Sequence, residues 1–209
     1  LAGYNIVLYD LPYMQHCADL NNFELYLGRD HSAIKFSEKE SNLRVDGGQS
    51  IAYKKASCYG REIVDMFFVA LKADSVKKKY VNYKMKNIIQ QEGLEVANRQ
   101  HYDAITIKDN WDNLAERVKI KQYAMHDGDD PIALFDLMIP AFFYLTRSIP
   151  KSFQAITETA AGGQINALLF RSYLQEGHSI PKRSPSYEFE GATSDGFPGL
   201  HKHVWKVDV

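Results

Sequence analysis

The chain has 209 residues, of which 45% are hydrophobic and 24% are charged, so it can bury the core of one large domain. Its formal net charge is -1, which argues against a simple DNA-binding module, because such modules carry an excess of basic residues. A net charge near zero does suit an enzyme whose acidic side chains hold metal ions, because these acids offset the local Lys and Arg residues. Cys17 and Cys58 stand in no motif spacing, and we expect free thiols rather than a disulfide.

The chain does not start with methionine and shows no signal peptide, so we expect an internal fragment of an intracellular protein, in the cytoplasm or the nucleus, of a host or a virus. The most apolar stretch, residues 132–145, is interrupted by Asp136 and Pro140. It is also shorter than the roughly 20 residues of a membrane span. We therefore expect no membrane partner.

The first residues predict a strand followed by a helix. Residues 1–4 are typical of the end of a buried strand. Asp10, with Pro12 close behind, suits a helix start, because Asp is a preferred N-cap and Pro is favoured in the first turn. We expect this helix to cover residues 13–27.

Residues 30–59 alternate polar and apolar side chains in short runs, with an Asp-Gly-Gly turn signal at 46–48. This pattern predicts a small hairpin insertion. The apolar run at 62–69 then predicts another strand.

The second half of the chain predicts mainly helices. Apolar residues recur at helical spacing within 77–91 and within 111–127. Asp130 and Pro131 form a second cap signal, which predicts a separate helix over 132–146 that Pro140 kinks or shortens.

Residues 153–173 predict one more helical segment, with a break at Gly162-Gly163, and residues 203–209 predict a final strand. Several helices with few strands indicate an α/β or α+β fold.

The segment at residues 3–13 reads Gly-Tyr-Asn-Ile-Val-Leu-Tyr-Asp-Leu-Pro-Tyr, and it ends the first strand with two polar side chains, Asn5 and Asp10. Taken alone, such a pair is usually turn and capping chemistry. A carboxylate at the end of an apolar stretch can also be held rigidly enough to bind a metal ion.

A second segment, residues 123–134, reads Tyr-Ala-Met-His-Asp-Gly-Asp-Asp-Pro-Ile-Ala-Leu. On a helix, Tyr123 and Asp127 are four residues apart and share one face. Without further context they read as a surface aspartate beside a half-buried tyrosine. We interpret Asp130 as an N-cap and Asp129 as solvated.

A third segment contains Phe189 and Gly191, then a Phe-Pro-Gly-Leu turn at 197–200, and an apolar strand that ends at Asp208. Alone it predicts only a turn and a strand.

In order and spacing, these three segments resemble the family B DNA polymerases. The first is similar to the family's second exonuclease signature and the second to its third, Tyr-x-x-x-Asp. The resemblance implies that Asp10 and Asp127 ligate metal ions of a 3′–5′ exonuclease. It implies that Tyr123 orients the attacking water and that Asn5 orders the loop or contacts the DNA end.

The third segment resembles the entry into the family's polymerase palm. Asp208 matches the first palm aspartate, which binds both catalytic metal ions. Phe189 and Gly191 match an element that contacts the template, although Phe189 stands where the family usually has Tyr. That change removes a hydroxyl but leaves a ring that can stack on a base. Residues 60–66, similar to another strand of the exonuclease domain, contain Asp65, which we expect to be structural.

The resemblance implies a ribonuclease H-like exonuclease domain, without its first strands, over residues 1–150. Residues 151–209 are then the helical connector and the start of the polymerase domain. The implied cofactors are two Mg²⁺ or Mn²⁺ ions per active site, each site being incomplete in this fragment. The implied partners are primer-template DNA, a single-stranded 3′ end and deoxynucleoside triphosphates, with the processivity factor unknown.

Two alternatives stay open. A stand-alone 3′–5′ exonuclease accounts for Asp10, Tyr123 and Asp127 but not for the ending at Asp208. A non-catalytic scaffold with a decayed exonuclease fold needs none of these side chains to react.

Overall fold

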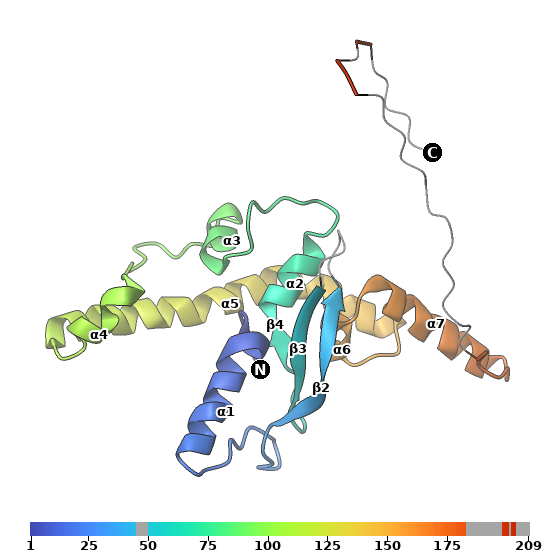
Figure 1. Ribbon diagram of the computed structural model, residues 1–209, viewed down its shortest axis with the longest axis horizontal. Coiled ribbons are helices and arrows are strands. Elements are labelled where there is room, and N and C mark those ends of the chain that lie inside the picture. Colours follow the sequence, from blue (N-terminus) through green and yellow to red (C-terminus); the bar gives the residue numbers. More distant parts are fainter. Residues whose placement is uncertain (45–49, 183–197, 201, 204–209) are drawn as a thin grey trace.

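The computed structural model describes residues 1–44, 50–182, 198–200 and 202–203 (Figure 1). The strands and helices follow in the order β1 (Ala2–Gly3), a π-helical turn (Ile6–Asp10), α1 (Leu11–Leu20), β2 (Lys35–Arg44), β3 (Ser50–Ser57), β4 (Val64–Asp65), α2 (Met66–Ala73), α3 (Met85–Gln91), a 3-10 turn (Ala104–Thr106), α4 (Ile107–Asn110), α5 (Leu114–Ser148), α6 (Phe153–Glu158) and α7 (Ala161–Gln175). The mixture of helices with few strands confirms the expected α/β content. The ribonuclease H-like assignment, the domain boundary at residue 150 and the strand at 203–209 stay predictions.

The predicted strand at residues 1–4 is present as β1, which pairs in parallel with β4. The predicted strand at 62–69 is wrong beyond Asp65, where α2 begins. The reason is local: the Asp65 carboxylate accepts a hydrogen bond from the Phe67 backbone N–H at 3.0 Å and so caps the helix. One residue thus ends the strand and starts the helix.

The predicted hairpin is confirmed. Strands β2 and β3 pair antiparallel from Lys35↔Ser57 to Arg44↔Ser50, with a register irregularity between Phe36 and Glu40. The turn signal at 46–48 lies outside the described residues. The hairpin stands beside α1 in Figure 1.

Helix α1 is shorter than the predicted range 13–27 and ends at Leu20. The Asn21 side chain donates to the Cys17 carbonyl at 2.7 Å, and Asn22 has φ of 53°, a left-handed conformation that stops the helix. At the other end, the π-helical turn runs directly into α1, so the Asp10 side chain makes no capping hydrogen bond.

Helix α5 is one continuous helix of 35 residues, and the two separate helices predicted at 111–127 and 132–146 are wrong. Pro131 and Pro140 both lie inside it. It starts where the Asn113 side chain accepts hydrogen bonds from the Ala115 and Glu116 N–H groups. Asp130 is buried in the middle of the helix and therefore is not an N-cap.

The helix expected within 77–91 is restricted to α3, because Asp74 holds the preceding segment. Its carboxylate accepts from the Lys79 N–H at 2.6 Å and from the Tyr80 N–H at 3.0 Å. The break expected at Gly162-Gly163 falls earlier, between α6 and α7, and the two glycines lie in the first turn of α7.

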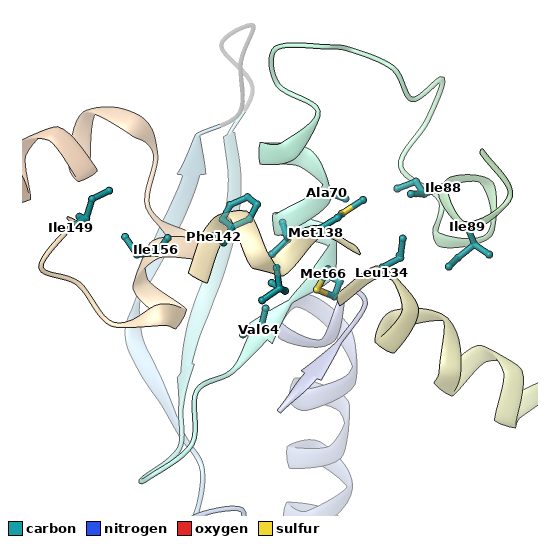
Figure 2. Close-up of a cluster of buried hydrophobic side chains, with 12 residues drawn as sticks. Val64, Met66, Ala70, Ile88, Ile89, Leu134, Met138, Phe142, Ile149 and Ile156 are labelled. Carbon is teal, nitrogen blue, oxygen red and sulfur yellow. The ribbon is translucent and has the colours of Figure 1, made fainter. Parts of the chain in front are cut away.

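The main hydrophobic core lies where β4, α2 and α3 meet α5 (Figure 2). Its fully buried side chains include Met66 from α2, Ile88 and Ile89 from α3, and Leu134 from α5. Each such side chain contributes about 1.5–3 kcal/mol to folding. This core fixes α3 against α5 and so sets the distance between side chains on the two helices.

A second core joins α1, the hairpin and α2, and it includes Leu11, Leu43, Tyr53 and Phe68. Cys58 is buried there, and both Cys17 and Cys58 are free thiols, as expected. Among the described residues, no helix has the length and apolar character required to span a bilayer.

Candidate functional site

Tyr123 and Asp127 lie one turn apart in the first half of α5, as the i, i+4 spacing predicts. Neither is fully buried, and the Asp127 side chain is 28% exposed. Both side chains meet a residue of α3 that the sequence patterns did not single out.

That residue is Lys86. Its Nζ donates to the Tyr123 hydroxyl at 2.6 Å and lies 3.3 Å from Oδ1 of Asp127. The same Nζ is 4.2 Å from the centroid of the Tyr123 ring, within the range of a cation–π contact. Lys86 therefore ties the two predicted site residues to α3.

Asp127 has a second cationic partner, Arg99, in the segment between α3 and α4. The Arg99 Nη2 lies 2.9 Å from Oδ1 of Asp127 and 2.6 Å from Oδ2 of Asp130, while its Nη1 donates to Oδ1 of Asp130 at 2.8 Å. The hydrogen bond to Asp130, helped by the nearby charges, raises the pKa of Arg99 above its ordinary value. Next to it, His126 Nδ1 accepts from the Gln100 N–H at 3.2 Å, which fixes the segment against α5.

Asn5 adopts a left-handed conformation with φ of 64°, and its backbone N–H donates to Oδ1 of Asp65 at 2.7 Å. The Val7 N–H donates to Oδ2 of the same carboxylate at 3.0 Å. Burial raises the pKa of Asp65 to about 6, although these N–H groups favour the charged form. Asp65 thus holds the loop that carries Asn5, which supports the structural role expected for it.

A pocket of about 550 Å³ lies between this loop and the start of α3. Tyr4, Asn5 and Phe67 line one side, and residues 83–87 line the other. The Tyr4 hydroxyl donates to the Tyr83 carbonyl at 2.6 Å and closes one edge. Burial raises the pKa of the Tyr4 hydroxyl, so it stays a neutral donor. The pocket brings predicted residue Asn5 and Lys86, the partner of Tyr123 and Asp127, to one place.

Asp10 is exposed at the last position of the π-helical turn and does not line this pocket. It lies close enough to Asp65 for its charge to contribute to the raised pKa of that carboxyl, as the weakest of the causes. Asp208, Phe189 and Gly191 lie outside the described residues.

The predicted metal ligands do not assemble into a metal site within the part of the chain that the structure describes. No group of three or more His, Cys, Asp or Glu side chains there is placed to hold an ion. One oxygen of Asp127 is already shared by Arg99 and Lys86. Asp10 and Asp127 alone offer too few oxygen ligands for Mg²⁺ or Mn²⁺.

Sequence reasoning missed Lys86 and Arg99 because their partners are distant in the chain. Lys86 is separated by 37 residues from Tyr123, and Arg99 by 31 residues from Asp130. Asp130 was the signal in the sequence that could have indicated a partner such as Arg99. A carboxylate inside an apolar helical repeat must either cap a helix or pair with a cationic side chain.

No family model matches the chain. In an alignment of 212 positions, the chain is 26% identical to a DNA polymerase of Archaeoglobus fulgidus. The match covers 100% of this chain and 24% of the relative. Over 201 residues it is 23% identical to the DNA polymerase delta catalytic subunit of Plasmodium falciparum, covering 92% of this chain and 18% of that protein.

Among solved structures, the family B DNA polymerase of the hyperthermophilic archaeon Pyrobaculum calidifontis matches the fold with a TM-score of 0.66. The sequences are 17% identical, and the match covers 88% of this chain and 22% of that one. The chain spans about a quarter or less of the length of each of these proteins. The resemblance to the family B DNA polymerases that the motifs indicate is therefore confirmed, and the chain matches one part of such an enzyme.

Proposed function

We propose that the protein is a DNA-directed DNA polymerase of family B with a 3′–5′ proofreading exonuclease. The observation that carries the proposal is the sequence match to a DNA polymerase over 100% of this chain. Residues 1–150 then belong to the exonuclease domain, and residues 151–209 to the connector and the start of the polymerase domain. An intracellular location, in a cell or in an infected host, follows from a role in DNA replication.

The exonuclease role is assigned to Asp10, Tyr123 and Asp127, with Asn5 at the DNA end. Lys86 contacts both Tyr123 and Asp127 and lines the same pocket as Asn5. These contacts support the grouping of Tyr123, Asp127 and Asn5, whereas Asp10 is included on the motif resemblance alone. In this arrangement the Tyr123 hydroxyl accepts its hydrogen bond from Lys86 and keeps its own proton to donate to an attacking water. A single-stranded 3′ end would enter from the pocket side.

Divalent ions, Mg²⁺ or Mn²⁺, two in each site, would supply the Lewis acid for phosphoryl transfer. Asp10 and Asp127 are proposed as two members of a ligand set whose other members lie outside the described residues. The polymerase role falls to Asp208, with Phe189 and Gly191 at the template strand and deoxynucleoside triphosphates as substrates.

The test compares Asp127→Ala with Asp129→Ala in the intact natural protein. Asp129 is an exposed aspartate two residues away on the same helix, which makes it a matched control. Removal of a mispaired 3′ nucleotide from a labelled primer-template should fall at least about 100-fold in Asp127→Ala, or about 2.7 kcal/mol in barrier. It should persist in Asp129→Ala.

Primer extension measured on the same preparations separates the alternatives. The proposal expects extension to survive in both variants. Degradation without any extension in the unsubstituted protein would indicate a stand-alone exonuclease. The absence of both activities would indicate a non-catalytic scaffold.

A further inference from the structure

We propose that a cationic cavity beside the end of α2 binds a phosphate group, either one from a nucleic-acid backbone or a free phosphate. The cavity has a volume of about 260 Å³ and lies between the end of α2, the end of β2, α5 and the start of α7. That volume is several times the roughly 30 Å³ that one water molecule occupies in the liquid. The cavity shares no lining residue with the pocket of Asn5 and Lys86, so the inference does not depend on the proposed function.

Positive charge dominates the lining of this cavity. Arg44 and Lys72 supply two cationic side chains, and Ser75 and Gln164 supply neutral polar groups. Within residues 1–44 and 50–182, no Asp or Glu lines the cavity, and neither cation forms an ion pair. Lys72 is partly buried, and a charge that is withdrawn from water needs a partner of opposite sign. A bound anion would supply that partner.

The contacts of Lys72 hold its amine at the wall of the cavity. Its Nζ donates to the Ile156 carbonyl at 2.5 Å and to the Thr159 carbonyl at 2.7 Å. It also lies 5.5 Å from the centroid of the Phe142 ring. All three partners are uncharged, so they orient the ammonium group without neutralising it. Because an ammonium group has three N–H donors, one remains for a ligand.

Glu158 is the acid whose charge acts on Lys72, but it is committed to other partners. Its carboxylate accepts from the Gln154 side chain at 2.7 Å and lies 3.4 Å from the Lys55 Nζ. Burial lowers the pKa of Lys72 to about 8, and the Glu158 charge only partly opposes this shift. An anion in the cavity would favour the charged amine and raise this pKa towards its ordinary value of 10.5.

Gln164 and Arg44 complete the polar lining. The Gln164 Nε2 donates to the carbonyls of Ile156 and Thr159 at 3.3 and 3.1 Å, so the two backbone oxygens that orient Lys72 also orient Gln164. Arg44, the last residue of β2, is exposed. Its guanidinium can present two parallel N–H donors to one phosphate, a geometry typical of phosphate recognition. The cavity thus combines a fixed lysine with an accessible arginine.

The reactivity of Lys72 in the intact protein tests the inference residue by residue. The neutral amine reacts with an acetylating ester and the ammonium form does not, so the acetylation rate reports the charge state. The rate is measured at pH 8 by mass spectrometry of the Lys72 peptide while potassium phosphate replaces potassium chloride at constant ionic strength. A rise of one pKa unit lowers the neutral fraction at pH 8 from about one-half to about one-tenth, so saturating phosphate should slow acetylation at least about five-fold.

Two controls accompany this measurement. The acetylation rate of Lys121, an exposed lysine on α5, is read from the same digest and should change less than about two-fold. Arg44→Gln should raise the phosphate concentration for half-protection of Lys72 about ten-fold, because it removes a charged donor. Lys54→Gln removes the same charge from an exposed position on β3 of the same hairpin and should leave that concentration unchanged.

The source of the phosphate is separated by repeating the protection with an oligomer of deoxythymidine and with deoxythymidine monophosphate. Protection by the oligomer at a lower concentration of phosphate groups assigns the site to a nucleic-acid backbone. Protection by inorganic phosphate or the monophosphate, but not by the oligomer, assigns it to a free phosphate. Either result supports the inference.

Three results overturn it. Lys72 may be acetylated at the same rate with and without every phosphate compound. Chloride at the same ionic strength may protect Lys72 as well as phosphate does. Arg44→Gln may show the same half-protection concentration as Lys54→Gln. None of these results bears on the proposed polymerase and exonuclease activities, which are measured by extension and degradation of a primer.

Discussion

Arg99 and Asp130 form a two-point ion pair in which both side chains are buried, with exposed fractions of 3% and 1%. The guanidinium donates through Nη1 at 2.8 Å and through Nη2 at 2.6 Å. This pair anchors the segment between α3 and α4 to the middle of α5. The Arg99 Nη2 also donates a hydrogen bond to Oδ1 of Asp127 at 2.9 Å. A structural ion pair and the candidate site thus share one side chain.

Replacing Arg99 should destabilise the protein more than replacing an exposed arginine. Arg99→Met leaves the buried Asp130 charge without its partner, which typically costs about 3–5 kcal/mol. Arg147→Met is the control, because Arg147 is exposed in the last turn of α5 and such surface substitutions usually change stability by less than about 0.5 kcal/mol. Urea unfolding of both variants measures the difference.

The double variant Arg99→Met with Asp130→Leu distinguishes a buried charge from lost packing. It should recover most of the lost stability, since no unpaired charge then remains at Asp130. A double variant as unstable as Arg99→Met would contradict this explanation.

Asp65 should make stability depend on pH in the acidic range. Burial raises its pKa to about 6 from an ordinary value of 3.8, so the folded state holds the proton more tightly than the unfolded state. The free energy of unfolding should therefore fall as the pH rises from about 4 to about 6.

Asp65→Asn removes this titration and should flatten the profile over the same range. It should also lower stability at every pH by about 1–3 kcal/mol, because an amide nitrogen cannot accept the Val7 N–H. Asp129→Asn should keep the slope of the unsubstituted protein. Parallel profiles for the unsubstituted protein and Asp65→Asn would show that another group is responsible.

Lys72 should produce the opposite slope in the alkaline range. Its Nζ donates to the Ile156 carbonyl at 2.5 Å and to the Thr159 carbonyl at 2.7 Å, at the end of α6. Burial lowers its pKa to about 8, although the nearby Glu158 carboxylate opposes the shift. The unfolded state binds more protons between pH 8 and 10.5, so the free energy of unfolding should rise across that range.

Lys72→Met should remove the alkaline rise and, at neutral pH, loosen the contact between α2 and the end of α6. Unfolding free energies at pH 8, 9 and 10 measure the slope, with Lys119→Met, a surface lysine on α5, as the control. A rise that survives in Lys72→Met would assign it to a different group.

The elements that local sequence chemistry determines could be predicted. The strand at residues 1–4 and the hairpin at 30–59 follow from alternation and turn residues, and both are present. The spacing of Tyr123 and Asp127 placed them on one helical face without any knowledge of the fold.

The errors arise where a distant partner overrides a local signal. Asp130 followed by Pro131 has the pattern of a helix start, but Arg99 pairs with the carboxylate and the helix continues through the proline. Likewise, nothing near Lys86 in the sequence indicates that packing of α3 on α5 brings it to Tyr123. Such contacts depend on tertiary packing, which periodicity and capping rules do not contain.

We propose that one chain carries parts of two different active sites, and the ratio of nucleotide removal to nucleotide addition tests this most directly. The ratio is determined on one labelled primer-template for the intact protein, Asp127→Ala and Asp208→Ala. The account predicts reciprocal losses: Asp127→Ala extends the primer but does not degrade it, and Asp208→Ala degrades it but does not extend it. Loss of extension in Asp127→Ala with degradation intact would contradict the account.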